Sequence, residues 1–122
     1  MTPKSELGKT GEDQAVRFLK AKGYVILRRN YRQQWGEIDL IARSPEGTLV
    51  FVEVKTMRKA GEDSLVPEDQ VTSGKLRKLR RVCETFLSQN ESMIDKSKGW
   101  RIDLVALTLN EEDFIIKHYE NI

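Results

Sequence analysis

Apolar and polar residues along the chain repeat with two different periods, and these periods predict where helices and strands lie. Apolar residues recur at spacings of three and four in Thr10–Lys22 and again in Glu68–Gln89, which is typical of helices with one buried face. Short runs rich in Val, Ile, Leu and Phe predict strands at Tyr24–Arg32, Trp35–Arg43, Thr48–Thr56, Trp100–Leu107 and Asp113–Tyr119. The order helix, three strands, helix, two strands predicts one layered α/β domain over residues 1–122.

The second and third strands each carry an acid inside an apolar run, and the turn between them decides how these acids meet. An odd loop centred near Glu46 places Asp39 opposite Glu53, with Lys55 on the same face, whereas an even loop places the two acids on opposite faces. Two ionised carboxylates in apolar surroundings need a compensating charge. A divalent cation supplies it, and hard oxygen ligands favour Mg²⁺ or Mn²⁺.

Composition narrows the chemistry that the chain can perform. The 122 residues include one cysteine and one histidine, which excludes an internal disulfide, a Cys-rich zinc site and a His-based metal cluster. We expect Cys83 in the core and His118 on the surface, and we expect Asp103, another acid in an apolar strand, to pair with an arginine. No run of eighteen apolar residues and no signal-peptide core occur, so we expect a cytoplasmic protein that does not enter a membrane.

The formal net charge of +2 is small, but the positive charge is concentrated locally. One basic cluster surrounds Arg29 and the other lies within Lys75–Arg81. Solvated helix faces produce such clusters too, yet two of them beside a carboxylate pair favour a nucleic-acid backbone as partner. The candidate phosphate-binding residues are Lys75, Arg77, Lys78, Arg81, Arg29 and Arg32.

Several motifs together resemble a known family. The segments Gly36–Ile41 and Phe51–Lys55, preceded by Gly8–Glu12 and Arg29–Arg32, look like the bacterial YraN family of small predicted endonucleases. That family is similar to the archaeal Holliday junction resolvases of the restriction-endonuclease-like superfamily. The resemblance implies a mixed central sheet flanked by helices, in the order αβββαββ.

The resemblance also implies site residues. The superfamily signature of an Asp followed by Glu-x-Lys falls on Asp39, Glu53 and Lys55, with Asp39 and Glu53 as metal ligands. Glu12 matches an additional acid of the resolvase branch and is a third candidate ligand, although it also suits the positive end of a helix dipole. Lys75 matches a frequent lysine of the following helix. An arginine expected closely after the Lys-Thr pair is displaced here, because Met57 precedes Arg58.

The function implied is metal-dependent hydrolysis of DNA phosphodiester bonds, on branched DNA if the resolvase similarity extends to substrate. Two alternatives remain open at this stage: a nucleic-acid-binding module without cleavage, and a protein-interaction role without nucleic acid. In a third reading, Asp39 and Glu53 form a purely structural ion-pair network with Lys55. Resolving a four-way junction needs two symmetric cuts, so that substrate would require a homodimer.

Overall fold

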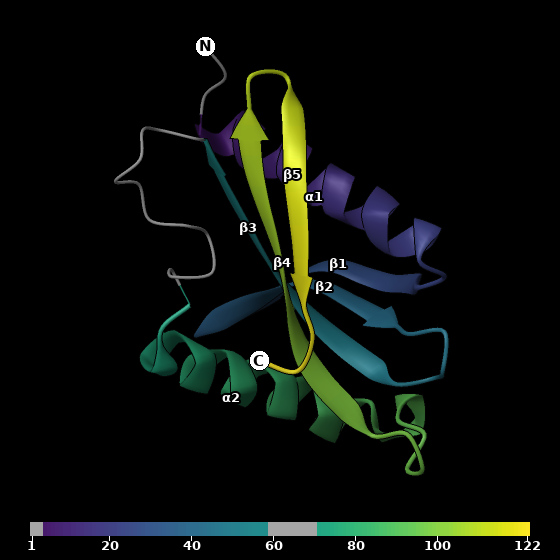
Figure 1. The fold of residues 1–122 in the computed structure, drawn as a ribbon. Coiled ribbons are helices and arrows are strands. Elements are labelled where there is room, and N and C mark those ends of the chain that lie inside the picture. Colours follow the sequence, from purple (N-terminus) through teal and green to yellow (C-terminus); the bar gives the residue numbers. More distant parts are fainter. Residues whose placement is uncertain (1–3, 59–70) are drawn as a thin grey trace.

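A computed structural model describes residues 4–58 and 71–122 and shows a mixed five-stranded sheet in the order β1-β2-β3-β4-β5 (Figure 1). The elements are α1 (Lys4–Ala21), β1 (Val25–Gln33), β2 (Gly36–Arg43), β3 (Leu49–Arg58), α2 (Ser73–Gln89), a short 3-10 helix (Glu91–Met93), β4 (Trp100–Asn110) and β5 (Asp113–Tyr119). The expected α/β class with a mixed sheet is therefore confirmed. Within the described ranges, no helix is long and apolar enough to cross a membrane.

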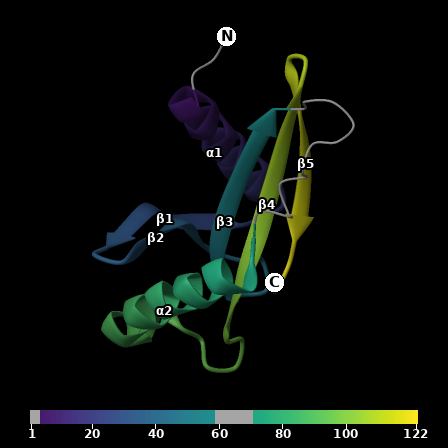
Figure 2. The same ribbon diagram turned by 90° about the vertical axis from the view of Figure 1, so that its left-hand side faces the viewer.

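The two helices cover opposite faces of the sheet (Figures 1 and 2). On the α1 face, Ala15 and Leu19 pack against alternate strand residues such as Val50 and Val52. On the α2 face, Val82 and Phe86 join a second cluster that contains Phe51. Cys83 belongs to this second cluster, which confirms it as a core residue, and burial raises the pKa of its thiol to about 12. The central strands are thus buried on both sides, as their continuous apolar runs require.

The turn between β2 and β3 has the odd parity on which the carboxylate geometry depends. Ser44 N donates to Thr48 O at 2.9 Å, and Gly47 takes a φ of 99°, which suits glycine. The ladder pairs Arg43 with Leu49 and ends with Leu40 opposite Val52. Asp39 and Glu53 continue this register by one position, just beyond the last pair of the ladder.

Strand β2 changes orientation at Asp39. Leu40 and Ala42 pack on the α1 face, whereas both Ile38 and Ile41 pack on the α2 face, so the alternation expected of a strand breaks between Ile38 and Leu40. The pairing with β3 stops at the same place, and the β1–β2 hairpin extends away from the sheet on the side of α2 (Figure 2). Asp39 consequently lies at the junction between the sheet and the projecting hairpin.

Strands β3 and β4 run parallel, from Leu49 opposite Trp100 to Arg58 opposite Leu109. Parallel neighbours need a crossover connection, and α2 lies within it. This arrangement brings the start of α2 to Glu53 and Lys55, because Lys75 and Leu76 line a pocket with them, while the rest of the helix packs on Leu49 and Phe51. Trp100 packs against the α2-face core, with its ring centroid 5.6 Å from that of Phe51, as expected for a strand-end anchor.

Helix α1 begins at Lys4, six residues before the predicted start at Thr10. Gly8 and Gly11 lower the helix propensity of this stretch. Burial of Leu7, which is 7% exposed, extends the apolar stripe by one turn and outweighs the low propensity. Glu12 therefore lies in the middle of the helix, so the expectation that it lies at the positive end of the helix dipole is wrong.

Helix α2 begins at Ser73, with Thr72 as its N-cap accepting from Lys75 N. The prediction began this helix at Glu68, but Val71 and Thr72 are not helical, and Glu68–Gln70 lie outside the described residues. Part of the predicted loop from Met57 to Pro67 also lies outside them. Its first two residues, Met57 and Arg58, extend β3 instead.

Gly11 allows α1 to lie directly against β3 beside the carboxylates. A Cβ at this position would lie 2.8 Å from Cγ2 and 2.9 Å from Cβ of Thr56, whereas one at Gly8 would meet nothing within 4 Å. We expect Gly11→Ala to lower the free energy of unfolding by about 1–2 kcal/mol, because overpacking outweighs the gain in helix propensity. The control Gly8→Ala should raise it by up to about 1 kcal/mol. Urea unfolding measures both, and equal effects would contradict the close approach.

Candidate functional site

The Asp39 carboxylate is held by the backbone of the neighbouring strand. Its Oδ2 accepts a hydrogen bond of 2.8 Å from Val54 N, in the gap left where the ladder stops. Burial raises the pKa of Asp39 to about 7, with the charge of Glu53 as the next cause and the bond from Val54 acting in the opposite direction. The Asp39 carboxyl group is therefore harder to ionise than an ordinary Asp, and a nearby cation would favour its charged form.

Glu53 and Lys55 form the second part of the site. Lys55 Nζ lies 3.2 Å from Glu53 Oε1, and both side chains are half-buried on β3. Burial raises the pKa of Glu53, and the charge of Lys55 offsets this only in part. The turn parity puts Asp39 and Glu53 at neighbouring positions of the hairpin, and the charge of Glu53 raises the pKa of Asp39, but the expectation that both side chains share one face is wrong, because they line different pockets.

The two acids line different hollows that meet at shared residues. We call the first the α1 pocket; it includes Glu12, Asn30, Asp39 and Arg58. We call the second the α2 pocket; it includes Trp35, Glu53, Lys75 and Leu79. Glu37 and Lys55 line both pockets. The change of orientation at Asp39 is the reason that its carboxylate opens to the α1 side while Glu53 opens to the α2 side.

Glu37 is a candidate site residue that reasoning from the sequence missed. It is exposed, it raises the pKa of both Asp39 and Glu53, and its Oε2 lies 3.4 Å from Arg32 Nε. Glu37 precedes Asp39 by two residues, which would put both on one face of a regular strand. That spacing alone does not distinguish a site residue from an ordinary surface acid.

Glu12 reaches the α1 pocket from the middle of α1 but is bound to β1. Its Oε1 accepts from Arg29 Nε at 3.1 Å, from Arg29 Nη2 at 3.0 Å and from Asn30 Nδ2 at 3.1 Å. Asn30 has a φ of 53°, a left-handed conformation that asparagine tolerates better than most residues. Arg29 also donates to Asp13 at 2.6 Å. Arg29 therefore links α1 to β1, and its guanidinium is bound to the carboxylates of Glu12 and Asp13.

The remaining basic candidates divide between the α2 pocket and the open surface. Lys75 and Lys78 are exposed on α2 and line the pocket that contains Glu53. Arg81 lines a smaller hollow with Trp35. Arg77 is exposed and borders none of these three hollows, and Arg32 is exposed beside Glu37. The structure thus brings two of the six candidates, Lys75 and Lys78, into the pocket of Glu53.

Comparison with known proteins identifies the family. Residues 11–107 match the family described as "Uncharacterised protein family UPF0102". The chain belongs to the UPF0102 family. This confirms the resemblance to the YraN family, which is the same family. The match begins at Gly11, which packs on β3. It includes the acids of both pockets, which are Glu12, Glu37, Asp39 and Glu53.

Relatives within UPF0102 are similar along nearly their whole length. A UPF0102 protein of Caldicellulosiruptor saccharolyticus is 42% identical over 115 residues, which cover 93% of this chain and 91% of the relative. One from Roseiflexus castenholzii is 38% identical, with 94% and 90% covered. Among solved structures, Pyrococcus furiosus SfsA in complex with Ca²⁺ aligns with a TM-score of 0.38 and 12% identity, over 93% of this chain and 60% of SfsA. A similarity of that size supports no statement about function.

The donor chemistry of this UPF0102 site fits a hard divalent cation only in part. Asp39 and Glu53 provide two carboxylates whose pKa values are raised mainly by burial, and Lys55 offsets the shift of Glu53 only in part. Mg²⁺ is commonly bound through one or two carboxylates and otherwise keeps its waters. Among the residues that the structure describes, no three His, Cys, Asp or Glu side chains are grouped to hold a metal. The pair therefore fits Mg²⁺, while Glu12 is turned toward Arg29 and Asn30.

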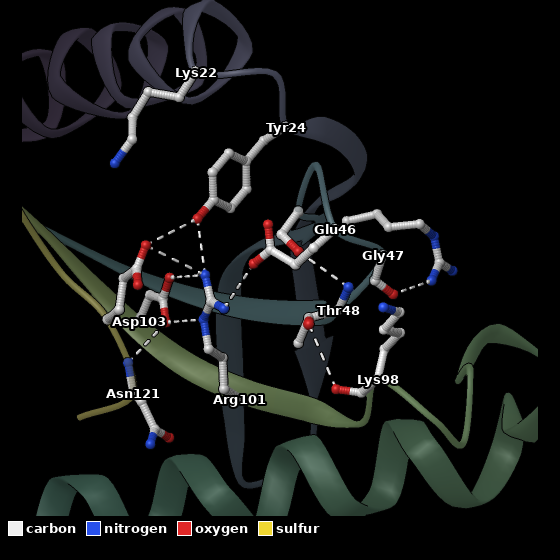
Figure 3. Close-up of polar contacts among 12 residues, drawn as sticks. Lys22, Tyr24, Glu46, Gly47, Thr48, Lys98, Arg101, Asp103 and Asn121 are labelled. Carbon is white, nitrogen blue, oxygen red and sulfur yellow. Dashed lines mark hydrogen bonds and ion pairs between the residues drawn. The ribbon is translucent and has the colours of Figure 1, made fainter.

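A second polar cluster of the UPF0102 chain centres on Asp103 of β4, which lies opposite Val52 of β3 (Figure 3). Asp103, with a fully buried side chain, accepts from Arg101 Nε at 2.9 Å, from Asn121 N at 3.0 Å and bonds His118 Nε2 at 2.8 Å. Arg101 also donates to Tyr24 OH at 2.8 Å. The expected pairing of Asp103 with an arginine is confirmed.

The expectation that His118 lies on the surface is wrong, because its side chain is only 4% exposed. Its Nδ1 lies 2.7 Å from Lys22 Nζ, and its ring packs edge to face against Phe18 and Tyr24. An ammonium group has no lone pair to offer, so Nδ1 accepts and Nε2 carries the proton that Asp103 accepts. The cluster thus joins α1, β1, β4 and β5 and serves to hold the fold together.

Proposed function

We propose that this UPF0102 protein is a metal-dependent endonuclease with a restriction-endonuclease-like site that hydrolyses DNA phosphodiester bonds. The observation that carries the proposal is the pair Asp39 and Glu53, two half-buried acids with raised pKa values beside Lys55. Keeping two acids in such surroundings costs stability unless a cation joins them. A purely structural network would pair each acid with its own base, yet within residues 4–58 and 71–122 Asp39 accepts a hydrogen bond from Val54 N while Lys55 contacts Glu53.

In this proposal the chain's own residues hold and orient the reacting groups. Asp39 and Glu53 would hold Mg²⁺ or Mn²⁺, and the ion would polarise the phosphate and lower the pKa of a bound water. Lys55 would orient the attacking water or stabilise the charge that develops on the phosphate. The hydrogen bond from Val54 N fixes one oxygen of Asp39, so the carboxylate is oriented before substrate arrives.

Lys75 and Lys78 would contact the DNA backbone, since both line the pocket of Glu53 and are exposed to solvent. Arg77, Arg81 and Arg32 would extend this contact as surface charges, each contributing mainly through counterion release. Arg29 suits a structural role better than a phosphate contact, because its guanidinium is bound to Glu12 and Asp13.

A DNA-binding module without cleavage is the second candidate, and one observation favours it. The third candidate ligand, Glu12, is bound to Arg29 and Asn30, which leaves two carboxylates for a metal. Such a module would retain the basic residues of α2 and would bind DNA equally well with and without a divalent cation.

Incubation of the purified protein with labelled linear, single-stranded, flapped and four-way DNA tests the two candidates. The nuclease predicts products in Mg²⁺ or Mn²⁺ and none in EDTA, because the carboxylate pair requires a cation to act. Products only from four-way DNA would indicate a resolvase, and that outcome requires a homodimer in light scattering. Binding without products on every DNA would reject the nuclease and favour the module.

A further inference from the structure

Trp35 is an aromatic residue left open to solvent beside the acids. It lies in the turn between β1 and β2 and is 55% exposed. The other large exposed apolar residues that the structure describes are aliphatic: Val25, Leu27 and Ile115. A large aromatic side chain exposed at the mouth of a pocket is typical of a binding surface.

The pocket below Trp35 has an apolar wall formed by α2. Leu76, Leu79 and Val82 line it, and its volume is about 190 Å³. This is smaller than the roughly 300–1,000 Å³ of sites for drug-sized ligands, so it suits one ring system. Gly36 allows the hairpin to lie this close to α2, because a Cβ there would come within 2.9 Å of Val82 Cγ2.

The charged residues around this apolar wall specify the ligand further. Three lysines, Lys55, Lys75 and Lys78, line the pocket together with two acids, Glu37 and Glu53. Lys55 is paired with Glu53, and Lys75 and Lys78 are exposed on α2. An apolar slot with two further cations at its edge is complementary to a flat ring that carries a phosphate next to it. An apolar protein side chain would use the slot but would gain nothing from the lysines.

We propose that the α2 pocket binds an unstacked nucleobase of the DNA strand, with Trp35 stacking on the base and Lys75 and Lys78 contacting the adjacent phosphate. This rests on the proposed function in so far as it places the base next to the carboxylate pair. Taking a base out of a paired duplex costs free energy, and the cost is least where the base is already unpaired. The pocket would therefore select flapped, branched or single-stranded DNA over a continuous duplex.

The test measures binding in EDTA, so that cleavage plays no part. Fluorescence anisotropy compares a matched duplex, the same duplex with one unpaired nucleotide, and the same with an unpaired abasic nucleotide. Wild-type protein should bind the unpaired base about tenfold more tightly than either control DNA, which is the size of a base–aromatic stacking effect. Trp35→Ala should remove this difference, and Trp35→Phe should retain most of it.

Val25→Ala is the matched control variant, because Val25 is 59% exposed and pairs with Arg43 at the opposite end of the hairpin. It should bind all three DNAs as the wild type does. Equal wild-type affinity for the unpaired base and the abasic site would overturn the pocket, even in a protein that cleaves DNA. A base-dependent difference that survives Trp35→Ala in a folded protein would also overturn it. Base-dependent binding without any cleavage would support nucleobase binding in the α2 pocket and would reject the nuclease.

Discussion

Asp39→Asn is expected to reduce metal-dependent DNA cleavage by about a thousandfold, because a bound metal supplies several kcal/mol of transition-state stabilisation and this carboxylate would hold it. DNA binding should be no weaker, since the substitution removes a negative charge. Cleavage assays in Mg²⁺ with matched binding assays in EDTA measure the two effects. Asp113→Asn, the same chemical change at an exposed residue outside the three hollows described here, should leave both unchanged. Full cleavage by the Asp39→Asn protein would reject the mechanism.

The Asp39→Asn substitution should also stabilise the fold. An acid with a structural role would instead destabilise the fold when replaced. The pKa of Asp39 is raised from 3.8 to about 7 by burial and by Glu53, so the folded state binds more protons than the unfolded state between these values. Wild-type stability therefore falls as pH rises through this window. At pH 8, Asp39→Asn should raise the free energy of unfolding by about 1–2 kcal/mol after allowing for solvent access, as measured by urea unfolding. At pH 5 the substitution should raise the free energy of unfolding only slightly. Added Mg²⁺ should stabilise the wild type more than the variant.

Asp103→Ala is expected to lower the free energy of unfolding by about 3–5 kcal/mol, the cost of breaking a buried ion pair from one side. Removing this fully buried carboxylate leaves Arg101 Nε, His118 Nε2 and Asn121 N without their acceptor. Urea unfolding measures the loss. Glu46→Ala is a matched control, because Glu46 also contacts Arg101, at 3.3 Å, but is 55% exposed. It should cost far less than Asp103→Ala, because solvent screens an exposed ion pair. Equal losses would contradict a buried cluster that joins the strands.

The cluster around Asp103 should also affect how the free energy of unfolding of the wild type depends on pH. Burial acts to raise the pKa of Asp103, but the hydrogen bonds from His118, Arg101 and Asn121 N outweigh it and hold the pKa below its ordinary value. Its contribution is therefore present above the unfolded pKa and is lost as pH falls through the folded pKa. Asp103→Ala should flatten the acid side of the stability profile below about pH 4. A profile as steep as that of the wild type would contradict this account.

The sequence by itself determined the local features of this protein. The turn of Ser44–Thr48 fixed the parity of the β2–β3 hairpin, because a side-chain period of two leaves only two choices. The apolar spacing located both helices, and the motif around Asp39 and Glu53 identified the UPF0102 family. Each of these inferences depends on residues close together in the chain, where periodicity and turn chemistry decide the outcome.

Only the tertiary structure decided the features that join distant segments. Burial of Leu7 set the start of α1 and moved Glu12 to mid-helix, against the low propensity of its glycines. The parallel pairing of β3 with β4 carried Lys75 on α2 to Glu53, and the pairing of β4 with β5 brought His118 to Asp103. The change of orientation at Asp39 placed the two acids in adjoining pockets. Such contacts follow from which faces bury together, and that packing is specified by the whole chain and by no single segment.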